Sequence, residues 1–149
     1  MAVGAFAAIP EIAVAEERPF RAEIEANAHL SDTEVPWIKR NDESGEGHAT
    51  HLGRFTWADI EFADFSTPGE VHVVATFTMT AADGDQLYGE FTTVGNFPDP
   101  GTLVIHGIFR FTGGTGRFAY ATGGGKLDAI GLLTEGLPVA GTMNGTINY

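Results

Sequence analysis

The chain has 149 residues, which is enough for one domain with one core or one small barrel. Eight Lys and Arg against 20 Asp and Glu give a net charge of −12, which repels nucleic-acid backbones and anionic lipids. We therefore expect neither a nucleic acid nor a membrane as a partner. The absence of Cys excludes disulfides, a thiolate nucleophile and a Cys-based zinc site, and we expect no cofactor.

The N-terminal stretch is apolar and ends at residue 15 in an Ala-Val-Ala triplet, which resembles the cleavage site of a secretory signal. It differs from such a signal in having no Lys or Arg and in containing Pro10 and Glu11. We expect residues 1–19 to form a flexible or edge-packing segment ahead of a barrel domain over 20–149. The poor match favours the cytoplasm over secretion.

Apolar and polar residues alternate with a period of two along most of the chain, which is typical of strands with one buried face. Residues 31–47 are an exception, because they have the composition of a loop. Glycines recur within the last two predicted strands, as in the tight corners of a small closed barrel. The pattern predicts an all-β fold with little helix, an antiparallel barrel or sandwich, and the strand glycines favour a single antiparallel barrel of about eight strands. The expected strands are 20–28, 51–65, 71–80, 86–94, 103–111, 125–133 and 139–147.

A glycine-rich segment lies between two of these strands. We expect Gly113, Gly114 and Gly116 to adopt positive φ in a tight reversal, which folds Phe118 back as a plug at one barrel end. A phosphate-binding loop is the alternative, but the Lys-Ser/Thr ending and the following helix of such loops are missing.

The segment Gly114–Phe118, followed by Ala121–Gly123, resembles the Gly-Thr-Gly-x-Phe and Ala-x-Gly motifs of allene-oxide-cyclase-like and dirigent-like calycin barrels. The segments His51–Thr56 and Ala81–Leu87 resemble small bacterial proteins of this kind, and the resemblance covers residues 48–149. It implies an apolar barrel in which a reactive intermediate is folded before ring closure or coupling. The Cys near the substrate of the plant cyclases is absent here, so we expect the fold to carry over rather than the reaction.

The interior of an eight-stranded barrel is either filled by side chains or just wide enough for one small ligand. Alternation predicts a set of large inward-facing side chains for which both outcomes remain open: they line a ligand pocket, or they fill the core. The predicted set is Phe77, Met79, Phe91, Phe109, Phe111 and Met143, together with Phe55 and Trp57 if their strand presents its aromatic face inward.

The strand 51–65 carries the candidate catalytic residues, but its pattern does not show which face points inward. If the Trp57 face does, Asp59 and Glu61 approach an apolar lumen, where desolvation raises a carboxyl pKa and makes the group a general acid or base. The alternative places these carboxylates at a wet strand end. If the other face points inward, Arg54 is the buried polar group and needs an acidic partner or an anionic ligand.

Histidines offer a weaker signal. His48 and His51 form an H-x-x-H, and His72 and His106 lie on other predicted strands. In a loop or strand this spacing lacks the helical geometry of the zinc-hydrolase signature, so we predict no metal site. No Gly-x-Ser-x-Gly elbow supports triad hydrolysis either.

We therefore expect a small-molecule-binding barrel for a largely apolar ligand, acting as a cyclase or isomerase by holding a reactive conformer. Such catalysis relies on orientation and needs few titrating groups. The alternative is a non-catalytic carrier, or a structural barrel whose packed lumen leaves it an interaction module. A homo-oligomer is compatible with either.

Overall fold

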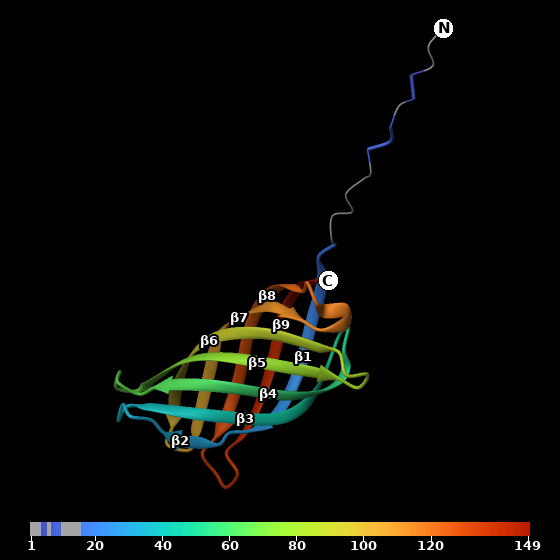
Figure 1. Cartoon of the computed structure of the whole chain (residues 1–149). Helices are drawn as coiled ribbons and strands as arrows, with labels where there is room; N and C mark the ends of the chain where they lie inside the picture. The colour runs from blue at the N-terminus through green and yellow to red at the C-terminus, as the bar shows by residue number, and fades with distance from the viewer. Residues whose placement is uncertain (1–3, 6, 10–15) are drawn as a thin grey trace.

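The computed structural model describes residues 4–5, 7–9 and 16–149, and within them the chain forms one closed antiparallel β-barrel (Figure 1). The predicted all-β fold is confirmed, and the one helix in the described part is the short 3-10 helix η1, Gly116–Phe118. No helix in these residues is both long enough and apolar enough to cross a membrane. The signal-like triplet at 13–15 lies outside the described residues.

The strands follow one another around the barrel in chain order, each antiparallel to the next. The barrel closes because β1 pairs with β9 on one side and with β3 on the other, which makes a ring of eight strands. The short β2 pairs only with β3 and is an addition to that ring. The strands are β1 (Arg18–Asn27), β2 (Leu30–Asp32), β3 (Ile38–Ala49), β4 (Gly53–Asp64), β5 (Glu70–Ala81), β6 (Gln86–Asp99), β7 (Thr102–Gly114), β8 (Thr122–Leu132) and β9 (Pro138–Asn148).

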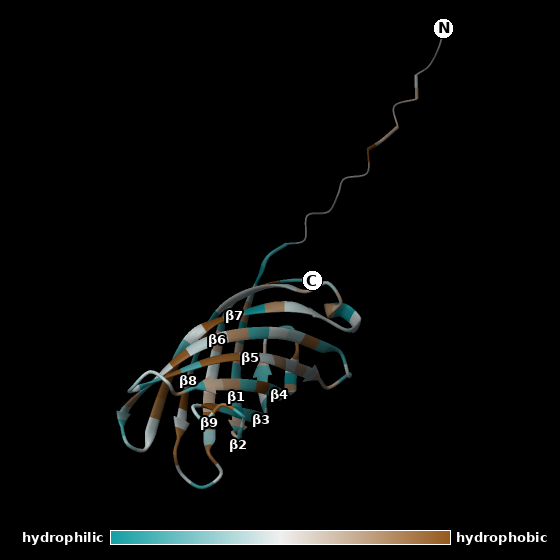
Figure 2. Ribbon diagram, turned by 60° about the vertical axis from the view of Figure 1, so that its left-hand side comes forward, coloured by the Kyte–Doolittle hydropathy of each residue, from teal (hydrophilic) through white to brown (hydrophobic). Residues whose placement is uncertain are grey.

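The seven predicted strands are all present, with their ends moved by a few residues. Figure 2 shows hydrophilic and hydrophobic residues interleaved along the ribbons, as expected for strands with one face toward the lumen. In β4 the inward face carries Phe55, Trp57 and Asp59, which are buried, whereas Arg54 is exposed on the outside. The Trp57 face is therefore the inner one.

The prediction of a loop over residues 31–47 is wrong, because most of this stretch forms β3. This strand escaped the periodicity because its inward positions before Ala49 are Asn41, Glu43, Gly45 and Gly47, none of them a large apolar residue. A Cβ on Gly45 would overlap a backbone oxygen of β1, so the glycine permits the close approach that joins β3 to β1. The polar composition thus belongs to the strand that closes the barrel.

The lumen is filled at the end where β1 begins and β9 ends. Phe20 contacts Phe111 at a ring-centroid distance of 4.9 Å, and Phe109 lies 5.3 Å from Phe111. The predicted plug is present, since Phe118 is fully buried at this end and its ring lies 5.0 Å from that of Tyr149. Aromatic packing of this kind leaves no room for a ligand in this half.

The glycine-rich turn beside the plug follows the prediction at two of three positions. Gly113 and Gly116 have positive φ, 139° and 56°. Gly114 does not, and a side chain there would instead overlap the carbonyl oxygen of Gln86 and touch Phe118. Position 114 requires glycine because neighbouring atoms leave no room for a side chain, and not because of its backbone conformation.

The turn generates a first prediction. Gly116→Val should lower the free energy of unfolding by about 1–3 kcal/mol, because a β-branched residue is strained at positive φ. The same change at Gly101, where φ is not positive and a Cβ would meet nothing closer than 3.5 Å, is the control. Urea unfolding of the two variants measures the difference, and equal midpoints would contradict the assignment.

Candidate functional site

The other half of the lumen holds a cavity of about 260 Å³. Its walls are mostly apolar and come from all parts of the ring, including Ile24 of β1, Val71 of β5, Ile105 of β7 and Leu127 of β8. Trp57 and Phe91 also line it, and they mark the level at which the filled half ends. The two outcomes left open by the sequence are thus both present, one in each half of the barrel.

The mouth of the cavity is apolar as well. Five large hydrophobic side chains both line the cavity and remain between 39% and 49% exposed, so they border its opening to solvent. Exposed apolar groups gathered at a cavity rim are typical of a binding site rather than of random surface composition. The five are Leu30, Phe65, Phe97, Leu132 and Leu133.

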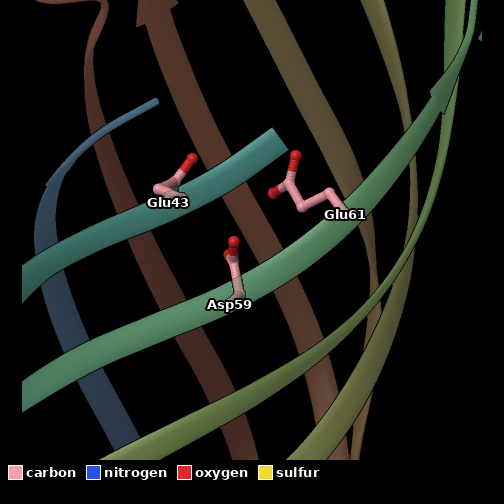
Figure 3. Close-up of side chains that lie close together, drawn as sticks. All are labelled: Glu43, Asp59 and Glu61. Atoms are coloured by element: carbon pink, nitrogen blue, oxygen red, sulfur yellow. The ribbon is translucent and has the colours of Figure 1, made fainter. Parts of the chain in front are cut away.

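Three carboxyl groups interrupt this apolar lining. In the antiparallel register Glu43 of β3 lies opposite Asp59 of β4, and Asn41 lies opposite Glu61. The period of two places all four side chains on the inner face of their strands. One oxygen from each carboxyl lies within 4.8 Å of the others, and Figure 3 shows the three side chains projecting from the two neighbouring strands. We call Glu43, Asp59 and Glu61 the carboxyl cluster.

Two side-chain donors hold the cluster in place. The indole Nε1–H of Trp57 donates to Oδ2 of Asp59 over 3.1 Å. The Asn41 amide donates to Glu61 Oε2 at 2.9 Å and to Glu43 Oε2 at 3.4 Å. The backbone N–H of His29 donates to Asn41 Oδ1 at 2.8 Å, which fixes the amide with its NH₂ toward the carboxyls.

One oxygen of the cluster is left over. Oδ1 of Asp59 is buried and has no hydrogen-bond partner among the described residues, while Asp59 as a whole is only 5% exposed. Buried polar atoms are nearly always paired, so an unpaired one in a residue that lines a cavity calls for a structural or functional explanation. Asp59 is therefore the central residue of the candidate site.

Burial raises the pKa of each member of the cluster, and repulsion from neighbouring carboxyls adds to the rise for Glu43 and Asp59. Burial, with the charge of Glu61 next, raises the pKa of Glu43 to about 7. Burial, followed by the charges of Glu61 and Glu43, raises the pKa of Asp59 to about 10. Burial also raises the pKa of Glu61, against the hydrogen bonds from Asn41 and Asp59. At neutral pH the empty cluster holds protons, and Asp59 is a neutral acid.

The cluster is the one group of three potential metal ligands in the part of the chain that the structure describes. It supplies three carboxyl groups, and the other side-chain oxygens of the lining are those of Asn41 and Thr93. Ca²⁺ takes six to eight oxygen ligands, and Mg²⁺ usually keeps several waters. Three carboxyls are enough for a cation that keeps several of its waters, but the apolar remainder of the wall offers such a hydrated ion no further ligands.

The histidines considered from the sequence do not converge on one point. His51 lies 3.1 Å from the hydroxyl of Tyr149 and 2.8 Å from the carbonyl oxygen of Pro19. His72 pairs with Glu70, and His106 with Asp128, both on the exposed outer surface. His48 is exposed on β3. Each has a local structural partner or faces solvent.

The structure separates the residues predicted for the site. Asp59 and Glu61 come together as candidate acids, but Arg54 points outward with its side chain 82% exposed, 3.7 Å from Glu46. The condition under which Arg54 was a candidate is therefore not met. Of the predicted ligand-binding set, Trp57 and Phe91 line the cavity. The other members of the predicted set are buried but lie outside the cavity lining: Phe55, Phe77, Met79, Phe109, Phe111 and Met143.

Glu43 and Asn41 were missed because they lie in the stretch expected to be a loop. The signal that could have found them is the spacing of Asn41, Glu43, Gly45 and Gly47, which alternates small or polar residues with period two. Without an apolar member, that alternation cannot be told from a polar loop.

The fold and the site define a closed antiparallel β-barrel whose lumen is filled in one half and open in the other. Three carboxyl groups interrupt the apolar lining of the open half. Comparisons of the chain with models of protein families, with curated proteins and with solved structures found no match in any of the three.

The raised pKa of Glu43 gives a second prediction. Glu43 binds its proton more tightly in the native protein than in the unfolded chain. The native protein therefore loses stability as the pH rises from 4.5, the ordinary pKa of the group, to about 7. The free energy of unfolding should fall across this window by on the order of 3 kcal/mol from Glu43. Denaturant unfolding at a series of pH values measures this slope.

Glu43→Gln should flatten that fall, because the amide does not titrate. Glu25→Gln removes the same charge from an exposed position on β1 and should leave the slope unchanged. Identical pH profiles for the two variants would show that Glu43 is not desolvated.

Proposed function

We propose that this protein binds a small, largely apolar molecule in the open half of its barrel, with the inner end of that molecule against Trp57 and Asp59. The observation that carries the proposal is the cavity itself, whose apolar walls open through an apolar mouth and end at a cluster of polar groups. A mainly hydrophobic pocket with a few convergent polar groups is the usual form of a small-molecule site.

The size of the cavity limits the ligand. Its volume of about 260 Å³ is just below the roughly 300 Å³ at which common ligand pockets begin. The floor cannot deepen easily, because Trp57 stacks on Phe77 at 4.9 Å, within the filled half. We therefore expect a compact ligand rather than a long lipid.

A catalytic form of the proposal uses the same cavity as a cyclase or isomerase. Dry walls would hold one conformer of a reactive molecule, and orientation alone supplies large rate effects. A neutral Asp59 facing the bound molecule would add a proton donor, since general acids of suitable pKa contribute typically 10²–10⁴-fold.

The alternative is a carrier that holds the same ligand without reacting it. It needs the cavity and the mouth but no proton donor. The cavity counts against a third role, that of an interaction module with a packed lumen, because only one half of the lumen is filled.

Bromobenzene provides a test of occupancy, since it is apolar, compact and quenches indole fluorescence on contact. It should quench Trp57 saturably, because that residue lines the cavity. Trp37 is 53% exposed and does not line the cavity, so its quenching should rise only in proportion to concentration. Fluorescence titration measures both components.

The two single-tryptophan variants separate these components. Trp37→Phe should keep the saturable quenching, and Trp57→Phe should remove it. Linear quenching alone in Trp37→Phe, with no saturable part, would mean that the open half does not admit an apolar molecule and would overturn the proposed function.

A further inference from the structure

We infer that the ligand of this cavity is a cation, an apolar body with one protonated amine that lies against Glu43, Asp59 and Glu61. The inference rests on the proposed function, because it assigns a charge and a head group to the molecule proposed there. It depends on the balance of donors and acceptors, on the unpaired oxygen and on the aromatic floor.

The lining holds no cationic group, and its side-chain donors are the Trp57 N–H, the Asn41 NH₂ and the protons that the carboxyl cluster itself holds. Three carboxyl groups face one another, and no Lys, Arg or His lies among the residues that line the cavity. The Trp57 N–H and the Asn41 NH₂ are already directed at carboxyl oxygens. A ligand that brings its own N–H donors supplies what the site lacks.

The unpaired Oδ1 of Asp59 gives the position of the missing donor. This oxygen is buried at the inner end of the cavity, and Oδ2 of the same group is occupied by Trp57. An ammonium has three N–H donors, as in lysine, and can reach several carboxyls at once. One ammonium among carboxyl oxygens that lie within 4.8 Å of one another would satisfy Asp59 and take the place of the protons that the empty cluster holds at neutral pH, which are released to solvent.

The floor of the cavity is compatible with a positive charge. Trp57 and Phe91 both line it, with ring centroids 6.4 Å apart. Aromatic rings attract ammonium groups, and the indole ring does so most strongly. An organic cation therefore finds carboxyl oxygens and π-systems at the same inner end.

Other head groups fit less well. A carboxylate or phosphate would place a negative charge beside three acidic groups, with no cationic residue in the lining to balance it. A divalent cation could use the three carboxyls and keep waters of its own, but it would leave the apolar wall of the cavity without a matching partner. Of the charged species, an amine on an apolar body matches both parts of the cavity.

Three probes of equal chain length separate charge from hydrophobicity: octylamine, octanol and octanoate. Each is titrated near neutral pH against the protein by calorimetry and by displacement of the neutral dye N-phenyl-1-naphthylamine. Octylamine should bind at least about tenfold more tightly than octanol, and octanoate most weakly, because the charge-assisted hydrogen bonds form only with the ammonium.

Asp59→Asn is the informative variant. It keeps the size of the side chain and an oxygen that accepts from the Trp57 N–H, but it removes the ionisable group. It should keep the affinity for octanol and lose most of the advantage of octylamine. Glu135→Gln makes the equivalent acid-to-amide change in the exposed turn between β8 and β9, outside the cavity lining. It should leave the advantage of octylamine intact.

The outcomes separate the two proposals. Binding of the dye and of octanol without preference for octylamine, or an equal loss of preference in Glu135→Gln, overturns the cationic ligand and leaves the apolar site standing. Absence of binding by the dye and all three probes overturns the proposed function itself. Saturable binding of CaCl₂ or MgCl₂ alone that Asp59→Asn abolishes would replace the amine with a metal ion and overturn this inference.

Discussion

The hydrogen bond from the Trp57 indole to Asp59 joins the two halves of the lumen. On one side Trp57 is fixed by stacking on Phe77, which belongs to the filled half. On the other side its N–H occupies one oxygen of Asp59, a residue of the cavity lining, and the other oxygen stays buried without a hydrogen-bond partner. A tightly packed core thus sets the position of a polar group that has no structural partner of its own. Preorganisation of this kind is what a binding or catalytic site requires.

The barrel accepts a local cost to keep this arrangement. Acidic groups directly opposed on neighbouring strands, as Glu43 and Asp59 are, repel one another unless they hold protons, and a buried carboxyl with no partner is costly as well. The cost is tolerable because the filled half supplies the hydrophobic burial. Groups that lower stability while facing a cavity are more consistent with function than with folding.

The sequence predicted the ring of strands from β4 to β9 because their buried faces carry large apolar residues at every second position. It could not place those residues along the barrel axis: Phe77 and Phe91 follow the same pattern, yet only Phe91 lines the cavity. Height in a barrel depends on strand tilt and register, which alternation does not encode. The site was half predicted, since Asp59 was a candidate but Glu43 was lost with the polar strand that closes the ring.

The central claim is that Asp59 lies dry and protonated at the inner end of an apolar cavity. The direct measurement is the ¹³Cγ chemical shift of Asp59 in labelled protein, followed by NMR from about pH 3 to pH 9, a range chosen to include ordinary carboxyl titration. The account predicts that exposed aspartates titrate in the acidic part of this range while the Asp59 signal stays that of the neutral acid, because its pKa is raised to about 10. A midpoint for Asp59 near its ordinary value of 3.8 would contradict the account, since it would mean that the carboxyl is hydrated and the cavity is not the desolvated site described here.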